Sequence, residues 1–359
     1  MITMALALIF CVQASAQKND TPLRLGVAGV SHGHLGEVGW RVGRGDFEVV
    51  GVYESNKDYW GRNALSKKVS QDKFYDDLGK MLDETKPEVV VAYGSIYDHL
   101  SVVEACAPRH IHVMVEKPLA TTVKQALKIK ALAEKYGIMV LTNFETSWYA
   151  TNQYAKQLVD SGEVGDVIRI DVYDGHEGPA EIGCDDKFLG WLTDPVLNGG
   201  GAVMDFGCYG ANLATWLMGG KAPKSVYAVL KQHKTGVYPK VDDDATILVE
   251  YDNCTLQIMP SWYWPYSRKD MYIYGSKGYI YQKNGKEMQI MKDAKLGDFF
   301  EAPALKTPYE DSFYYLKAAV RGEITVTPQD LASVENNVMV VRILEAAKKS
   351  AKTGKAVRF

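Results

Sequence analysis

The chain has 359 residues, a net charge of -3, and a composition that is 47% hydrophobic and 24% charged. These values indicate a globular protein with two domains, each large enough to bury a core. The slightly acidic balance provides no basic field for nucleic acid, and no cluster of Lys and Arg alternates with aromatic residues.

The first residues predict an export signal and not a part of the fold. Residues 4–12 are apolar but too few to span a bilayer, and Ala14-Ser15-Ala16 supplies the small residues that a signal peptidase requires. We therefore expect residues 1–16 to be removed after Ala16, giving a periplasmic or secreted protein without a membrane span. The later cysteines form neither a disulfide framework nor a zinc pattern, so free thiols are expected at Cys106, Cys184, Cys208 and Cys254.

Residues 22–142 are predicted to form a first α/β domain built on a doubly wound parallel sheet. Short apolar runs alternate here with amphipathic stretches, the pattern of a parallel sheet with helices on both faces. Strands are predicted at residues 24–30, 48–53, 88–93, 111–115 and 138–142, and helices at 34–43, 76–82, 98–107 and 123–136.

Residues 143–359 are predicted to form a second α/β domain with an open, mostly antiparallel sheet. Apolar and polar residues alternate along its strands, so one face should pack and the other stay free for a partner or ligand. The helices are predicted at 152–161, 309–321 and 328–350, and the strands at 167–173, 225–230, 245–251, 255–261, 268–274 and 278–283.

The first strand-to-helix turn, from Gly26 to His34, is a candidate phosphate-binding loop. Gly26 and Gly29 stand at the strand exit, where a close backbone approach and a helix N-terminus favour an anion. The other glycines of the usual fingerprint are displaced. Ser31 is expected to place its hydroxyl on a phosphate, and His32 or His34 to donate to one. The alternative is a tight turn that needs glycine for a positive φ.

Glu54 ends the second strand, where an acidic side chain accepts hydrogen bonds from both ribose hydroxyls and repels a 2′-phosphate. NAD is therefore preferred over NADP, the alternative being a solvated strand-end Glu. Ser95 and His99 are expected near the nicotinamide ribose, and Glu116 and Lys117 are predicted to contact the cofactor as well.

The segment Glu116-Lys117-Pro118 follows an apolar strand and predicts a positioned cation. An ammonium group beside the substrate oxygen lowers the pKa of the hydroxyl and stabilises the alkoxide-like charge that develops during hydride transfer. Pro118 restricts the backbone of Lys117 to an extended geometry. Lys117 is therefore the first candidate catalytic residue.

A second candidate segment runs from the glycine loop at residues 199–201 into a predicted helix. Asp205, Tyr209 and Asn212 are spaced to share one helical face. Tyr209 is expected to relay a proton, its pKa lowered by the charge of Lys117. Asp205 would hold a neighbouring substrate hydroxyl or orient Lys117, and Asn212 would contact substrate. The alternative is an N-capping Asp beside a packed Tyr.

Three further side chains are candidates for the substrate pocket. His176 lies near a strand end in the second domain, and Trp191 and Trp262 are expected to stack on a sugar ring. For aromatic residues of this region, packing on a sheet face is the alternative. No histidine spacing predicts a metal site.

Together these motifs resemble the Gfo/Idh/MocA oxidoreductase family over residues 22–359. The matching pieces are Glu116-Lys117-Pro118, the glycine loop leading to Asp205 and Tyr209, the segment 274–278, and the C-terminal segment 345–357. The resemblance implies that residues 22–142 are an NAD-binding Rossmann domain. It also implies NAD(P)-linked oxidation or reduction of sugars and polyols, and oligomer contact through the open sheet. Lys117 and Asp205 fall on catalytic positions, and Tyr209 stands where many members have histidine.

The leading hypothesis is therefore an exported oxidoreductase that moves hydride at a secondary hydroxyl or ketone of a sugar or glycoside. Its NAD would be retained and recycled within one active site, and the protein would be a homo-oligomer. One alternative is an NAD-dependent glycoside hydrolase or lyase that acts by transient oxidation and elimination. The other is a non-catalytic protein that binds the cofactor or a sugar.

Overall fold

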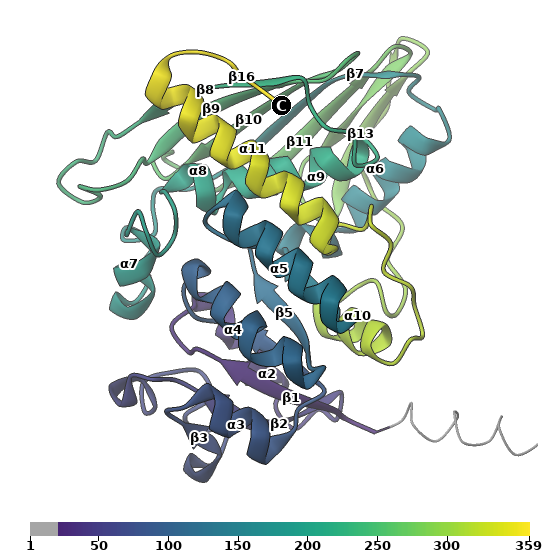
Figure 1. Cartoon of the computed structure of the whole chain (residues 1–359). Coiled ribbons are helices and arrows are strands. Elements are labelled where there is room, and N and C mark those ends of the chain that lie inside the picture. Colours follow the sequence, from purple (N-terminus) through teal and green to yellow (C-terminus); the bar gives the residue numbers. More distant parts are fainter. Residues whose placement is uncertain (1–20) are drawn as a thin grey trace, which may run out of the picture.

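The structure is a computed structural model that describes residues 21–359, so the predicted export signal lies outside the described residues. Figure 1 shows a sheet in the lower part of the molecule and a larger sheet across the top, with helices between them. Within the described chain, no helix combines the length and the apolar character needed to cross a bilayer.

The lower sheet has six parallel strands in the order β3-β2-β1-β4-β5-β6. This order reverses between β1 and β4, and such switch points form the crevice in which Rossmann folds bind dinucleotides. The predicted parallel domain is confirmed. Its strands are β1 (Leu23–Ala28), β2 (Phe47–Tyr53), β3 (Phe74–Tyr75), β4 (Val89–Ala92), β5 (His112–Glu116) and β6 (Val140–Asn143).

The helices that cover this sheet are α2 (Gly36–Arg41), α3 (Leu78–Thr85), α4 (His99–Cys106) and α5 (Val123–Tyr136). Helix α5 has the predicted bounds because both of its ends are marked in the sequence. Thr122 accepts a hydrogen bond from the amide of Gln125, and Gly137 ends the helix with a φ of 63°. Helix α2 is shorter than predicted because a 3₁₀ turn at Gly33–Leu35 precedes it.

The upper sheet is mixed but mostly antiparallel, as predicted, with β7 and β10 as its parallel pair. The strands β13 to β16 were not predicted, and three of them have only two residues each. The bounds are β7 (Val167–Gly175), β8 (Ser225–Lys231), β9 (Asp244–Glu250), β10 (Thr255–Ser261), β11 (Arg268–Gly275), β12 (Gly278–Gln282), β13 (Glu287–Lys292), β14 (Lys295–Leu296), β15 (Phe300–Glu301) and β16 (Val357–Arg358).

The register of the upper sheet separates a buried face from an outer face. Residues that pair across neighbouring strands point to the same side. One such row is buried throughout and consists of Ala228, Ile247, Ile258, Val172, Met271, Gln282 and Met288. The next row is polar or aromatic except for Leu248, and consists of Tyr227, Leu248, Gln257, Asp171, Tyr272, Tyr281 and Gln289.

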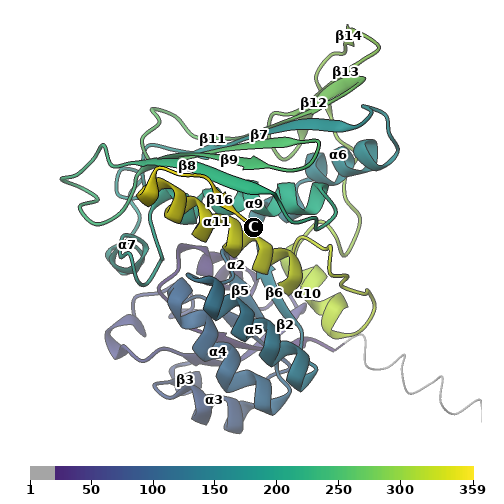
Figure 2. The same ribbon diagram turned by 45° about the horizontal axis from the view of Figure 1, so that its top comes forward.

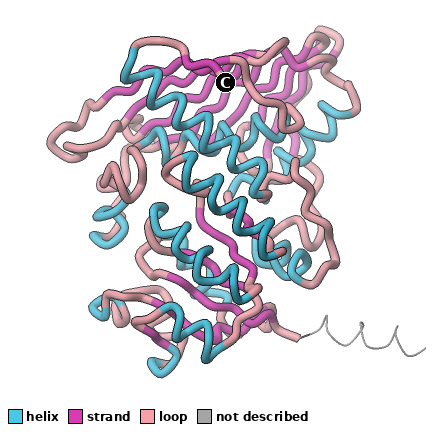
Figure 3. The backbone as a smooth tube through the Cα atoms, viewed as in Figure 1, coloured by secondary structure: helices cyan, strands magenta, loops and turns pink. Residues whose placement is uncertain are grey.

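Helices α6 (Ala150–Asp160), α9 (Gly207–Leu217) and α11 (Val334–Thr353) cover the buried face. Figure 2 and Figure 3 show helices on the side of this sheet that faces the lower domain. Helix α11 packs beside α5, with Val338 and Val341 in the same apolar cluster as Ile129. This packing joins the two domains.

Helix α10 (Ser312–Val320) belongs to the lower domain in space although it follows the upper sheet in sequence. Phe313 and Leu316 pack in one cluster with Leu25 and Val49 of the parallel sheet. The chain therefore returns to its first domain near its end, and a division at residue 142 does not describe α10.

Candidate active site

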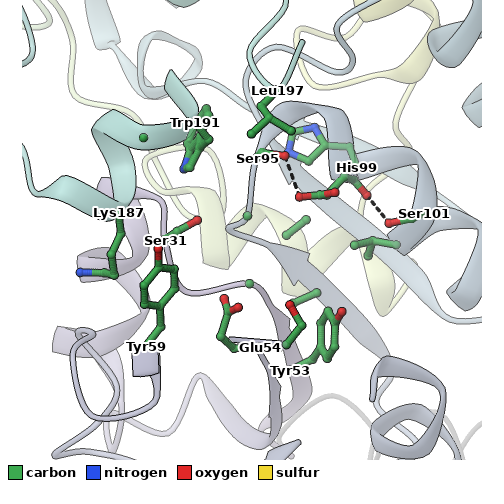
Figure 4. Close-up of a pocket in the computed structure, with 18 residues that line it drawn as sticks. Ser31, Tyr53, Glu54, Tyr59, Ser95, His99, Ser101, Lys187, Trp191 and Leu197 are labelled. Atoms are coloured by element: carbon green, nitrogen blue, oxygen red, sulfur yellow. Dashed lines mark hydrogen bonds between the residues drawn. The ribbon is translucent and has the colours of Figure 1, made fainter. Parts of the chain in front are cut away.

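A cleft of about 340 Å³ lies at the carboxyl ends of β1, β2 and β4. This is the place where a Rossmann sheet binds its dinucleotide. Five residues that the sequence assigned to the cofactor line this cleft: Gly29, Ser31, Glu54, Ser95 and His99. Figure 4 shows the labelled side chains around the opening.

Gly29 is required at the turn after β1. Its φ is 83°, and a Cβ atom built there would lie 2.5 Å from the amide nitrogen of Gly94. Gly26 has a different reason to be glycine, because its Cβ would press against Val90 at 3.1 Å inside the sheet. Gly26 does not line the cleft, so its predicted cofactor contact is replaced by a packing role.

Glu54 is held at the floor of the cleft by two backbone donors. Its Oε2 accepts from the amide of Val30 at 3.2 Å and its Oε1 accepts from the amide of Asn56 at 2.9 Å. A carboxylate has about four lone-pair sites, so each oxygen keeps capacity for a ribose hydroxyl. The residues that follow, Ser55 and Asn56, carry no positive charge for a 2′-phosphate.

His99 presents an unpaired acceptor beside the cleft. Its Nδ1 lies 3.2 Å from the carbonyl oxygen of Leu119, to which it donates, and its buried Nε2 has no hydrogen-bond partner among the described residues. Burial lowers the pKa of His99 to about 4, so the ring is neutral at pH 7. A neutral imidazole nitrogen in this place suits a hydroxyl donor, which fits the predicted position of a ribose.

His32, His34 and Glu116 form a hydrogen-bonded cluster beside the cleft and do not line it. Glu116 accepts from Nδ1 of His34 and from the amide of Asn143, both at 2.9 Å. Burial raises the pKa of Glu116, but the two histidines and Asn143 outweigh it and lower that pKa to about 2. The predicted cofactor contacts of His32 and Glu116 are therefore indirect, through the packing that supports the cleft.

This cluster also has the composition of a metal site, with ligand atoms of His32, His34 and Glu116 within 4.8 Å of one another. However, Nδ1 of His32 accepts a hydrogen bond from the amide of His34 at 3.1 Å. The proton of a neutral His32 ring is then on Nε2, the nitrogen that faces Glu116. In this arrangement Nε2 offers no lone pair to a metal ion.

Lys117, Asp205 and Trp262 form a buried triad that joins the two domains. Lys117 follows β5, and its ammonium group donates to the carboxylate Oδ1 of Asp205 and, at 2.9 Å, to the carbonyl oxygen of Asp205. The indole of Trp262 donates to the other carboxylate oxygen at 2.9 Å. Burial alone would lower the pKa of Lys117, but Asp205 outweighs it and the pKa is raised.

Burial raises the pKa of Asp205, but the charge and hydrogen bond of Lys117 and the hydrogen bond of Trp262 outweigh it, so the pKa is lowered. The carboxylate of Asp205 is therefore ionised, and each of its oxygens accepts a hydrogen bond. Of its two predicted roles, the geometry supports the orientation of Lys117, because each oxygen already has a donor and Asp205 does not line the second cavity described below. Trp262 is fully buried, so it positions Asp205 and does not stack on a sugar.

Tyr209 lies beside Lys117 as expected, with its ring centroid 5.0 Å from Nζ. Its predicted pKa shift is wrong in sign. Burial, with further contributions from Asp174 and Glu145, raises the pKa of Tyr209 well above its ordinary value. The phenol therefore remains protonated and acts as a hydrogen-bond donor at neutral pH.

Asn212 does not join this cluster. The carbonyl of Asp205 is bonded to Lys117, and the amide of Tyr209 bonds to Phe206 at 3.1 Å, so the helix is interrupted between α8 (Ala202–Asp205) and α9. The amide of Asn212 donates to the carbonyl of Leu331 at 2.8 Å. Its predicted substrate contact is replaced by a structural bond toward the start of α11.

A second cavity of about 560 Å³ is lined by Phe206, the residue that follows Asp205 of the triad. His176 lines it, which agrees with the predicted placement, and its pKa is lowered mainly by burial. Trp191 instead lines the first cleft, where its ring lies 5.4 Å from that of His32. The predicted substrate contact of Trp191 is therefore replaced by a place in the cofactor cleft.

Three site residues were missed from the sequence. Lys187, on helix α7 (Asp186–Leu192), reaches the first cleft from the second domain, as does Trp191 on the same helix (Figure 4). Asp174 and Lys269 line the second cavity. Asp174 carried a usable signal, because it continues the buried row of Ile170 and Val172 on β7 with a charged residue.

The residues of the first cleft fit NAD. They supply an acidic strand end for the ribose diol, serine hydroxyls, a glycine turn at the switch point, and the unpaired nitrogen of His99. The strand order and this site define an NAD-binding Rossmann oxidoreductase with a second α/β domain.

The chain belongs to the Gfo/Idh/MocA oxidoreductase family. Residues 23–144 match the oxidoreductase family model with an NAD-binding Rossmann fold, and residues 152–281 match the GFO/IDH/MocA C-terminal domain model. The chain is 27% identical over 241 residues to a trans-1,2-dihydrobenzene-1,2-diol dehydrogenase of Xenopus tropicalis, covering 66% of this chain and 67% of the relative.

It is also 28% identical over 215 residues to a D-glucoside 3-dehydrogenase of Escherichia coli, with 58% of each chain covered. Among solved structures, an inositol dehydrogenase homolog from Azotobacter vinelandii complexed with NAD+ is similar, with a TM-score of 0.79 and 16% identity. That alignment covers 94% of this chain and 98% of the other, and it supports the fold.

Proposed function

We propose that the protein is an exported NAD-dependent oxidoreductase that acts at a secondary hydroxyl or ketone of a sugar or glycoside. The observation that carries this proposal is the triad of Lys117, Asp205 and Trp262 beside Tyr209. Asp205 uses two of the three N–H groups of Lys117. The third is available to a substrate oxygen near the rings of Phe206 and Tyr209.

When bound, NAD supplies the hydride acceptor for oxidation of the alcohol carbon. The chain supplies the charge and the proton. Lys117 stays positively charged and stabilises the oxygen as negative charge develops on it. Tyr209, kept protonated by burial, donates its proton to the oxygen in ketone reduction and regains one from solvent water. In alcohol oxidation it takes up the hydroxyl proton as its own phenolic proton passes to water.

Two observations support a polyol substrate with a retained cofactor. The second cavity has polar and aromatic walls, including Tyr149, His176 and Lys269, and two relatives are named for a diol and for a glucoside. Export would place the enzyme where free NAD is scarce, and Lys187 and Trp191 of α7 cover the cofactor cleft from the second domain. A cofactor that stays bound between turnovers fits both the scarcity of free NAD and the cover over its cleft.

The first test is to denature the purified protein and identify any released dinucleotide and its redox state. Turnover of a panel of glycosides and polyols is then measured by nicotinamide absorbance and product analysis. We expect NAD to be released and a keto-sugar to form. Release of free aglycone without net NADH would instead favour elimination, and no bound dinucleotide with no turnover would overturn the proposal.

The variant Lys117→Met tests the triad. Removal of a positioned proton donor and charge typically costs about 10²- to 10⁴-fold in rate, so we expect a loss of kcat in this range with NAD still bound. The matched control is Lys128→Met on α5, whose lysine is more than half exposed. Export is tested separately, by the N-terminal residue of protein recovered from the periplasm or medium.

A further inference from the structure

Asp174 differs from the other carboxylate at the second cavity. Both oxygens of Asp270 accept hydrogen bonds from the guanidinium group of Arg268, at 2.5 and 3.0 Å. Asp174 is 1% exposed, and its Oδ2 is buried with no hydrogen-bond partner among the described residues. A buried unpaired carboxylate is costly to a fold, so this oxygen needs an explanation in the function of the site.

The strand pairing places a lysine directly beside Asp174. Asp174 on β7 pairs with Lys269 on β11, in the same register that brings Val172 opposite Met271. Nζ of Lys269 lies 3.9 Å from Oδ1 of Asp174, too far for a direct hydrogen bond. This ammonium group donates instead to Glu145 at 2.8 Å and retains further N–H groups.

This pair lies next to the reacting centre. Nζ of Lys269 is 4.3 Å from the ring centroid of Tyr209, and Nζ of Lys117 is 5.0 Å from the same centroid. Asp174 and Tyr209 also line one small cavity together. A molecule that places one oxygen at Lys117 therefore brings neighbouring atoms within reach of Asp174 and Lys269.

The sequence suggested Asp205 for a neighbouring substrate hydroxyl, but its oxygens accept from Lys117 and Trp262, and Asp174, not Asp205, lines the second cavity. We propose that Asp174 and Lys269 bind a second substrate hydroxyl, on a carbon adjacent to the one oxidised, so that the enzyme selects vicinal diols of a sugar or polyol ring. Asp174 accepts a hydrogen bond from this hydroxyl, and Lys269 donates one to its oxygen. The inference rests on the proposed function and names its substrate class.

The test compares methyl β-D-glucopyranoside with its 2-deoxy and 4-deoxy analogues in wild type and Asp174→Asn. In wild type we expect loss of one of these hydroxyls to lower kcat/KM by about 10- to 100-fold, as for a hydrogen bond to a charged group. In Asp174→Asn we expect that preference to fall to a few-fold or less, mostly through KM.

The matched control is Asp171→Asn. Asp171 lies on the same strand, but on the outer face, where Arg169 donates to both of its oxygens at 2.7 and 3.0 Å. This variant should keep the wild-type preference between parent and deoxy glycoside. If Asp174→Asn fails to fold, Lys269→Gln takes its place and should also reduce the preference.

Calorimetric binding of the same glycosides to the NADH-loaded enzyme separates the two proposals, because it needs no turnover. Turnover or binding with the same preference in Asp174→Asn as in wild type overturns the Asp174 site and leaves the oxidoreductase intact. Equal use of parent and deoxy glycosides by wild type overturns it too. If the enzyme neither turns over nor binds any glycoside or polyol, the proposed function itself is overturned.

Discussion

The hydrogen bond from Trp262 to Oδ2 of Asp205, at 2.9 Å, fixes the carboxylate that orients Lys117. The variant Trp262→Phe keeps an aromatic ring and removes the donor, and an unpaired buried acceptor costs about 1–3 kcal/mol. We expect kcat to fall by about 10-fold or more. The pKa of Asp205 should rise, which moves the acid limb of the pH–rate profile to higher pH.

The pH–rate profile distinguishes this role from simple packing, because a packing defect lowers the rate without moving the limb. Trp216→Phe is the control, since Trp216 is also buried in the second domain but lies at the far end of α9. An acid limb at the same pH in Trp262→Phe and wild type would contradict the positioning role.

The pKa of Asp174 predicts that the stability of the protein depends on pH. Burial raises its pKa to about 7, against the opposing charges of Lys269 and Lys117 and with smaller contributions from Asp205 and Glu145. An unfolded Asp has a pKa of about 3.9. As pH rises between these values, the unfolded chain releases the proton first, so the contribution of Asp174 to stability falls and is lost above about pH 7.

Asparagine at this position cannot ionise, so Asp174→Asn should gain stability relative to wild type as the pH rises from about 4 to 8. Thermal unfolding at several pH values measures this difference, with Asp171→Asn as the control. A constant difference in melting temperature across that range would show that Asp174 keeps an ordinary pKa.

At the scale of elements, helix α7 is an example of a segment that its local sequence did not predict. Helix α5 and strand β10 have the predicted bounds because caps and alternation mark them locally. The segment of α7 has only seven residues, and its role depends on a docking site supplied by the other domain. There, the rings of Trp191 and Phe188 lie 5.4 and 5.0 Å from that of His32.

This packing predicts that Trp191 holds α7 over the cofactor cleft. In Trp191→Ala we expect the Kd for NADH to rise by about 10-fold or more, because burial of a large aromatic side chain is worth about 1.5–3 kcal/mol. Arg62 also reaches α7, through a bidentate pair with Asp186. It is exposed, so Arg62→Ala should change the Kd by less than about 5-fold.

Fluorescence titration with NADH measures both variants. A larger effect for Arg62→Ala than for Trp191→Ala would show that the exposed ion pair, and not the aromatic packing, retains the helix over the cleft.

At the scale of the whole molecule, strand alternation predicted the two sheets, and the motifs with the family resemblance singled out Lys117 and Asp205 as candidate catalytic residues. The sequence also suggested that Asp205 orients Lys117, but it did not predict the bond from Trp262 to Asp205 or the pairing of His34 with Glu116. Trp262 is 57 positions from Asp205, and His34 is 82 positions from Glu116. Contacts over such separations leave no local periodicity. For the same reason Asn212 was placed by helical spacing alone, although its amide bonds to the distant Leu331.

The outer face of the upper sheet gives the last prediction. Figure 2 shows its helices on the side toward the lower domain, and Tyr227, Val229 and Leu248 on the outer side are each about 40% exposed. A stable interface buries about 1,200–2,000 Å² and centres on apolar and aromatic residues. We therefore predict that this face joins two copies of the chain.

Leu248→Arg places an unpaired charge at the centre of that interface, where an unpaired buried charge costs several kcal/mol. We expect a dimer of wild type in light scattering and a monomer of the variant at micromolar concentration. The control is Leu127→Arg on α5, because Leu127 is 50% exposed on the other domain. A dimer that survives Leu248→Arg and dissociates with Leu127→Arg would place the interface on the Rossmann domain, and the open sheet would then need another explanation.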